Sequence, residues 1–106
     1  MRIAQILYKG ERAGILTQLD NSSFHFTYNE DWLSDNSKPS ISLTLPKSQI
    51  EFESEALFPF FYHLLPEGIN KRMICKTYKI DENDAFGILL QASKVDTVGA
   101  VTIERM

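Results

Sequence analysis

The sequence has few of the residues on which small catalytic, metal-binding or secreted domains depend. Its 106 residues include one cysteine, Cys75, and two histidines, His25 and His63, at no spacing typical of a zinc site or a catalytic triad. A single thiol forms no internal disulfide and fits a reducing cytoplasm. The five glycines are scattered singly, so no glycine-rich phosphate loop is present. We therefore expect no metal, no cofactor and no catalytic residue.

An excess of positive charge and a long hydrophobic run are also missing. The 11 basic and 14 acidic side chains give a formal net charge of −3, so the broad basic footprint of a nucleic-acid-binding domain is absent. The longest apolar run, residues 56–65, contains Pro59 and His63 and is far shorter than a membrane-spanning helix. The first seven residues are too short and too polar for a signal peptide. We expect a cytoplasmic protein without membrane or direct nucleic-acid partners.

What remains is the composition of a folded domain. Hydrophobic residues make up 43% of the chain and aromatic residues 11%, which argues against intrinsic disorder. A length of 106 residues matches one domain rather than two. We therefore expect a single domain over residues 1–106, more typical of a binding or accessory module than of an enzyme.

Alternation of apolar and polar residues predicts an antiparallel sheet. Residues 2–18 read as a hairpin with a turn at 9–11, and residues 24–28 alternate aromatic and polar side chains. Phe24, Phe26 and Tyr28 should face the core, with His25 and Thr27 toward solvent. Residues 41–45 and 98–103 are predicted as further strands, and residues 47–52 as extended or irregular chain.

The segments around the strands carry weaker signals. Trp32 is predicted to anchor a polar loop over the edge of the sheet. Glu51, Glu53 and Glu55 alternate, so an extended backbone would place them on one exposed face.

Three short helices are predicted between residues 58 and 91. The first spans residues 58–65, because Pro59 suits the first helical turn and Pro66 ends it. Its core-facing residues should be Phe60, Phe61, Leu64 and Leu65. The third spans residues 85–91, with an N-cap among residues 81–84 and a buried stripe of Phe86, Leu89 and Leu90. The whole pattern predicts an α+β fold, with a small antiparallel sheet packed with about three short helices.

The second predicted helix, residues 69–78, carries the most pronounced local charge. Arg72, Lys76 and Lys79 recur on one side, with Met73, Ile74 and Thr77 sharing another. The basic stripe suits phosphates, an acidic patch on a protein partner, or plain solvent exposure, and the pattern leaves these open.

Several segments, taken in order, are similar to one known family. They are residues 14–16, 24–28, 32–33, 41–46, 59–68, 84–90 and 96–101. In content and order they resemble the N-terminal subdomain of HipA-type serine/threonine kinases, the toxins of bacterial toxin–antitoxin systems. The similarity spans essentially the whole chain, and residues 60–68 and 96–100 are its most specific parts. Lys94, where the family usually has glycine, and His63, often asparagine or another small polar residue, depart from the pattern.

The resemblance implies a function because this subdomain precedes a catalytic domain in HipA-type kinases. None of the phosphate-loop or aspartate motifs of that catalytic domain occurs in these 106 residues. A free-standing copy resembles the HipS-like antitoxins of three-component HipB–HipS–HipT systems. The resemblance thus implies a non-catalytic subunit that binds and neutralises a HipT- or HipA-type kinase. It leaves open whether a HipB-like helix-turn-helix protein joins the complex.

If the chain docks to a kinase, the connection between the first two predicted helices is a candidate contact. Gly68 permits a tight backbone path, and Ile69 is placed to be displayed beyond it. We expect Glu67, Gly68, Ile69, Arg72 and Lys76 to contact the kinase, with the loop entering its active-site cleft. The alternative is that residues 66–68 only connect two helices.

Other functions compete with the antitoxin interpretation. The chain also fits a docking or regulatory subdomain of a split HipA-type kinase without an antitoxin role. A small nucleic-acid-binding module would use the basic stripe and bind with strong salt dependence. An enzyme would have to rest on Cys75 or His63, for which no supporting motif exists.

Overall fold

The computed structural model describes residues 1–95 and 100–106. One antiparallel sheet has the strand order β4-β3-β2-β1-β5, and four helices lie within these residues, which confirms the predicted α+β class. The strands are β1 (Arg2–Tyr8), β2 (Glu11–Gln18), β3 (Phe24–Tyr28), β4 (Glu51–Ser54) and β5 (Val101–Arg105). The helices are α1 (Glu30–Ser34), α2 (Pro59–Tyr62), α3 (Gly68–Tyr78) and α4 (Ala85–Val95).

The first three strands form the predicted meander. β1 pairs with β2 from Arg2↔Gln18 to Tyr8↔Glu11, with one register shift between Ile6 and Leu7. On β3 the three aromatic residues are buried, as the alternation predicts. His25 and Thr27 are half-buried rather than fully exposed. Strand alternation therefore identified the core face of the sheet correctly.

The strand predicted at residues 41–45 is wrong. These residues form a turn with one isolated bridge, Ser42↔Leu45, and the fourth strand of the sheet is β4, which pairs with β3. The physical reason lies on β3: the Tyr28 hydroxyl accepts a hydrogen bond from the Ile41 N–H at 3.1 Å and donates to the Leu45 carbonyl oxygen. Ile41 and Leu45 are buried because they anchor the turn, so their spacing resembles that of a strand.

The polar segment before this turn contains a short helix, α1, that the sequence did not predict. Trp32 is 3% exposed, its ring centroid lies 5.6 Å from that of Tyr8, and its Nε1–H donates to the Pro39 carbonyl at 2.9 Å. Trp32 thus anchors the segment as expected, but from a helix rather than from a loop.

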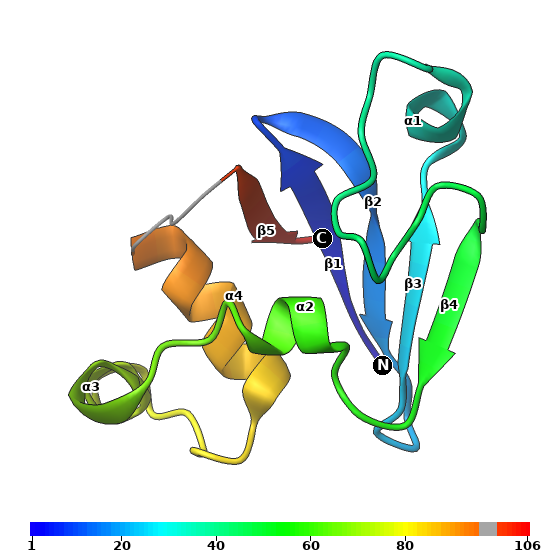
Figure 1. Ribbon diagram of the computed structural model, residues 1–106. Coiled ribbons are helices and arrows are strands. Elements are labelled where there is room, and N and C mark those ends of the chain that lie inside the picture. The colour runs from blue at the N-terminus through cyan, green and yellow to red at the C-terminus, as the bar shows by residue number, and fades with distance from the viewer. Residues whose placement is uncertain (96–99) are drawn as a thin grey trace.

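Helices α2 and α4 cover one face of the sheet (Figure 1). α2 begins at Pro59, one residue after the predicted start, and ends at Tyr62. Beyond it, turns with Leu64 N–H→Phe61 O and Leu65 N–H→Tyr62 O bonds replace the predicted helix. Phe61 is fully buried, whereas Phe60, Leu64 and Leu65 are only partly so.

α4 supplies the rest of the helical layer. Its predicted stripe of Phe86, Leu89 and Leu90 is buried, and the helix continues to Val95, beyond its predicted end at residue 91. β5 then pairs with β1 over Val101–Arg105. The predicted beginning of this strand at residues 98–99 lies outside the described residues, as does Asp96.

α3 lies at the periphery. Figure 1 shows it beyond α4, on the side away from the sheet, and α4 is the element against which it packs most. A helix packed on one side leaves its remaining surface free for contacts with another molecule.

Candidate functional site

The connection between α2 and α3 turns at Pro66, Glu67 and Gly68. Pro66 has no backbone N–H and cannot extend the preceding turns. Glu67 is extended, and Gly68 has φ of +60°, in the left-handed region that glycine tolerates best. A Cβ at Gly68 would meet no atom within 4 Å, so glycine is required there by backbone conformation and not by lack of space.

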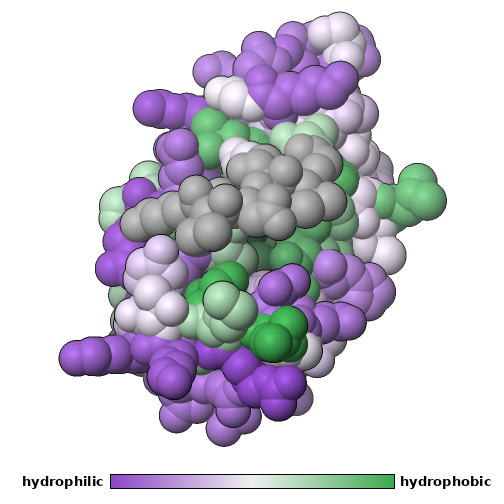
Figure 2. All heavy atoms as spheres, turned by 90° about the vertical axis from the view of Figure 1, so that its left-hand side faces the viewer, coloured by the Kyte–Doolittle hydropathy of each residue, from purple (hydrophilic) through white to green (hydrophobic). Residues whose placement is uncertain are grey.

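The outward side of α3 combines apolar and basic side chains. Ile69, Arg72, Met73 and Lys76 follow i, i+3, i+4 and i+7 spacing, which places them on one helix face, and all four are exposed. We call these four residues the α3 surface. Ile69 is 66% exposed and Met73 60%. Figure 2 looks toward this side of the molecule and shows hydrophobic groups among hydrophilic ones below the grey residues.

The α3 surface carries uncompensated positive charge. Arg72 and Lys76 take part in no ion pair within the described parts of the chain, where the ion pairs join Met1–Asp20, Arg2–Asp84 and Lys38–Glu11. Two such cations beside exposed Ile69 and Met73 fit a partner that offers acidic groups around an apolar contact.

A hollow of about 370 Å³ lies on the other side of the α2–α3 connection, against the start of α4. Its apolar lining includes Tyr62, Leu65 and Ile88, and its charged rim includes Glu67 and Lys71. The further lining residues are Pro66, Gly68, Glu82, Asn83 and Ala85. The hollow thus adjoins the predicted loop without including Ile69.

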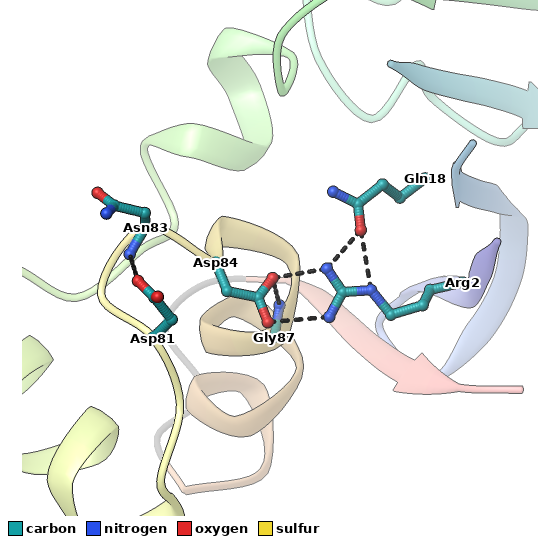
Figure 3. Close-up of polar contacts among 6 residues, drawn as sticks. All are labelled: Arg2, Gln18, Asp81, Asn83, Asp84 and Gly87. Atoms are coloured by element: carbon teal, nitrogen blue, oxygen red, sulfur yellow. Dashed lines mark hydrogen bonds and ion pairs between the residues drawn. The ribbon is translucent and has the colours of Figure 1, made fainter. Parts of the chain in front are cut away.

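An ion pair fixes the start of α4 (Figure 3). The Arg2 guanidinium donates to both carboxylate oxygens of Asp84, at 3.0 and 2.6 Å, and Arg2 Nε donates to Gln18 Oε1 at 2.8 Å. Of the predicted N-cap candidates at residues 81–84, Asp84 is the cap, since its Oδ1 accepts the Gly87 N–H at 3.2 Å. The Arg2 hydrogen bond, aided by that of Gly87 and opposed by partial burial, lowers the pKa of Asp84. The Arg2–Asp84 ion pair therefore links the start of α4 to β1, and α3 packs against α4.

The structure divides the five predicted site residues into two groups. Glu67 and Gly68 line the hollow, and Ile69, Arg72 and Lys76 lie on the α3 surface. All five are exposed and so accessible to another molecule. Their role in binding a kinase stays a prediction.

The sequence missed two exposed residues next to these. The helical pattern places Met73 with Ile74 on a face separate from the basic residues. Met73 is nevertheless exposed on the same face as Ile69, because α3 turns Lys71, Ile74 and Cys75 toward the protein instead. The i, i+4 spacing of Ile69 and Met73 was the signal available. Tyr62, 60% exposed at the end of α2, had none, since its position depends on where α2 ends.

The two residues considered for chemistry, Cys75 and His63, lie on different elements. Cys75 is a buried free thiol on α3, and His63 is exposed at the end of α2. Within residues 1–95 and 100–106, no three His, Cys, Asp or Glu side chains are grouped so as to hold a metal ion. Across the same residues, no helix is long and apolar enough to cross a membrane.

Comparison with known proteins defines the family. The family model of the HipA N-terminal domain matches residues 4–104. A solved structure described as "N-terminal domain of HipA toxin" superposes with a TM-score of 0.72 at 29% identity, covering 100% of this chain and 93% of that one. The chain therefore belongs to the HipA N-terminal domain family, a domain distinct from the kinase domain.

The relatives come in two sizes. A protein of Haemophilus influenzae named "Uncharacterized protein" is 38% identical over 104 residues, covering 98% of this chain and 92% of its own. Two Sinorhizobium fredii proteins, "Putative kinase Y4mE" and "Putative kinase Y4dM", are each 28% identical and cover 84% and 89% of this chain. The chain spans only 21% and 24% of those two kinases, so most of each lies beyond the matched domain.

Proposed function

We propose that this protein is a HipS-like antitoxin, a non-catalytic cytoplasmic subunit that binds and neutralises a HipT- or HipA-type serine/threonine kinase. The observation that carries the proposal is the α3 surface, which displays Ile69 and Met73 alongside Arg72 and Lys76 on a peripheral helix. Exposed apolar side chains flanked by charge are typical of a protein-binding surface.

Two properties of the relatives support this choice. In the two named kinases the matched domain is followed or preceded by a much larger remainder, to which a domain of this kind can dock. The Haemophilus influenzae relative instead matches along nearly its whole length, so a protein of about this size exists there without that remainder. A separate subunit that meets its kinase in trans fits both facts.

Inhibition by such a subunit needs no chemistry of its own. The α2–α3 connection projects Glu67 and Gly68 next to exposed Ile69, and a segment of this shape blocks substrate or nucleotide by occupying the kinase cleft. Arg72 and Lys76 add electrostatic steering toward an acidic surface. A HipB-like helix-turn-helix protein is proposed as the third component, and DNA is contacted through it rather than through this chain.

The test is a pull-down with the tagged chain from its native host at moderate salt, with bound proteins identified by mass. Recovery of a kinase that is then inhibited by the purified chain supports the antitoxin function. Recovery of a kinase whose activity is unchanged supports a docking subdomain instead. Recovery of nucleic acid in a salt-sensitive manner, lost on Arg72→Glu with Lys76→Glu, supports the nucleic-acid module.

A matched control separates specific contacts from net charge. Arg12 and Arg105 are exposed basic residues on β2 and β5. The double variant Arg12→Glu with Arg105→Glu changes the net charge as much as Arg72→Glu with Lys76→Glu does. We expect it to bind the kinase like the unmodified protein, whereas the α3 double variant loses binding.

A further inference from the structure

Leu43 is the most exposed large hydrophobic residue that the structure describes, with 99% of its surface accessible. Isolated apolar residues on a surface are common and need no special explanation. Leu43 differs from such residues because the backbone that carries it is held rigidly on both sides.

The two residues that flank the turn are anchored on β3. The Tyr28 hydroxyl accepts the Ile41 N–H at 3.1 Å and donates to the Leu45 carbonyl oxygen. Ile41 is 6% exposed and Leu45 2%, so both side chains belong to the core. Ile41 and Leu45 therefore anchor the turn in the core, whereas the side chain of Leu43 points into solvent.

Hydrogen bonds within the turn complete its rigidity. The Leu45 N–H donates to the Ser42 carbonyl at 3.1 Å, and the Thr44 N–H donates to Ser42 Oγ at 3.2 Å. The hydroxyls of Ser42 and Thr44 lie 3.0 Å apart. A side chain displayed on a pre-organised backbone loses little conformational entropy when it is bound.

The fold itself gives no reason for a leucine at this position. Central turn positions favour proline, glycine, serine, asparagine and aspartate, each for a local physical reason. Leu43 departs from that preference and gains no packing in return, because its side chain is exposed. A residue that breaks a local sequence preference without improving the packing of the fold is expected at a functional site.

The chain segment that carries Leu43 is free of charge. Residues 39–46 contain no charged side chain, in a chain that is 24% charged. The flanking lysines are engaged elsewhere: Lys38 pairs with Glu11, and Lys47 Nζ donates to the carbonyl oxygens of Asp35 and Lys38 at 2.8 Å each. The turn therefore suits a neutral apolar receptor, unlike the basic α3 surface.

We propose that Leu43 is a second docking contact, which inserts into an uncharged apolar pocket on the partner kinase; this rests on the proposed function. A second copy of this chain is a poorer receptor, because the hollow beside α3 is bordered by Glu67, Lys71 and Glu82. The relatives named as kinases hold most of their length beyond the matched domain, which is where a pocket of this kind would lie.

The test measures the affinity of the kinase recovered in the pull-down for purified variants of this chain. Loss of one buried leucine contact predicts that Leu43→Ser weakens binding by about tenfold to a hundredfold. Leu43→Met keeps the apolar volume and should bind within about threefold of the unmodified protein. Met106→Ser changes another exposed apolar residue, 65% accessible at the chain end, and should have no effect.

Measurements of salt dependence and of self-association distinguish the Leu43 contact with a kinase from its alternatives. The loss caused by Leu43→Ser should be equal at about 50 and about 300 mM NaCl, because no charge is involved. Unchanged affinity of Leu43→Ser, while Ile69→Asp loses binding, overturns the Leu43 contact and leaves the proposed function intact. No binding by the unmodified protein overturns both. Sedimentation showing that Leu43→Ser abolishes a homodimer assigns the contact to a second copy and also overturns the inference.

Discussion

The carboxylate of Asp84 holds the guanidinium of Arg2, 82 residues earlier in the chain, through two hydrogen bonds of 2.6 and 3.0 Å. The same carboxylate caps α4 through the Gly87 N–H. One side chain therefore joins β1 at the beginning of the sheet to the helix against which α3 packs. This contact adds to the buried face of α4, with Phe86, Leu89 and Leu90, in placing the helix that supports α3.

We expect Gly87→Ala to destabilise the fold even though alanine favours helices. A Cβ at position 87 would lie 2.4 Å from Asp84 Oδ2, so the carboxylate would have to move away from Arg2 and from its capping position. The helix-propensity gain is about 1 kcal/mol, and loss of the cap alone costs about as much. With the Arg2 bonds also disturbed, urea denaturation should show a net loss of about 1–2 kcal/mol.

The Asp84→Ala background provides the control for this prediction. Without the carboxylate the nearest group to the new methyl is the side-chain methyl of Ile80, at 3.3 Å, which needs to give by a few tenths of an ångström. Gly87→Ala should therefore be close to neutral or stabilising there. Equal destabilisation in both backgrounds would show that the Asp84 contact is not the cause.

The lowered pKa of Asp84 makes stability depend on pH in one direction. Its ordinary value is 3.8, and the Arg2 hydrogen bond holds it lower in the folded protein. A depressed folded pKa adds stability that is present above the unfolded value and is lost as pH falls through the folded one. We expect Asp84→Asn to flatten the loss of stability below about pH 4, measured by thermal unfolding across pH.

Other carboxylates contribute to the same acid range. Hydrogen bonds from the N-terminal ammonium and from Ser37 lower the pKa values of Asp20 and Asp35. The contribution of Asp84 to the pH dependence of stability is therefore measured as the difference between the unmodified protein and Asp84→Asn. Glu82→Gln removes a neighbouring exposed carboxylate, and a curve as flat as that of Asp84→Asn would contradict the assignment.

Truncation of Phe61 should be far more costly than truncation of Leu65. Phe61 is fully buried, with ring centroids of Phe60, Phe26 and Phe58 at 5.2, 5.7 and 6.3 Å. Phe61→Ala should lower the free energy of unfolding by about 3–5 kcal/mol. Leu65 is only partly buried at the hollow, so Leu65→Ala should cost clearly less. Equal losses in chemical denaturation would contradict this description of the core.

Removal of the Tyr28 hydroxyl tests the anchoring of the 41–45 turn. Tyr28→Phe leaves the Ile41 N–H and the Leu45 carbonyl without their partner, which costs about 1–3 kcal/mol where the groups are buried. Burial also raises the pKa of Tyr28, so the hydroxyl stays protonated and able to donate. Hydrogen exchange of the Ile41 amide should speed up, whereas the β1–β2 amides should keep their protection. Unchanged exchange at Ile41 would contradict the anchor.

The sequence predicted well what short-range patterns control. Alternation located β3 and its buried aromatic face, Pro59 located the start of α2, and Asp84 was among the predicted caps of α4. These signals act within a few residues of the structure they produce.

Features that depend on distant partners were not predicted. Alternation predicts a strand at residues 41–45, whereas the anchor that makes them a turn, Tyr28, acts from another element. The exposure of Met73 follows from how α3 packs against α4, and the hollow combines the α2–α3 connection with Ile88 of α4. The five candidate site residues are exposed, but which of them share a surface depends on the fold, and their contact with a kinase stays a prediction.

The most direct test of the antitoxin function measures the activity of the recovered HipT-type kinase with increasing amounts of this chain. We predict that substrate phosphorylation falls to background near equimolar ratio. Ile69→Asp, which keeps the same unfolding temperature because its side chain is exposed, should fail to inhibit. Full kinase activity in the presence of a stoichiometrically bound chain, or inhibition by Ile69→Asp equal to that of the unmodified protein, would contradict an antitoxin that acts through the α3 surface.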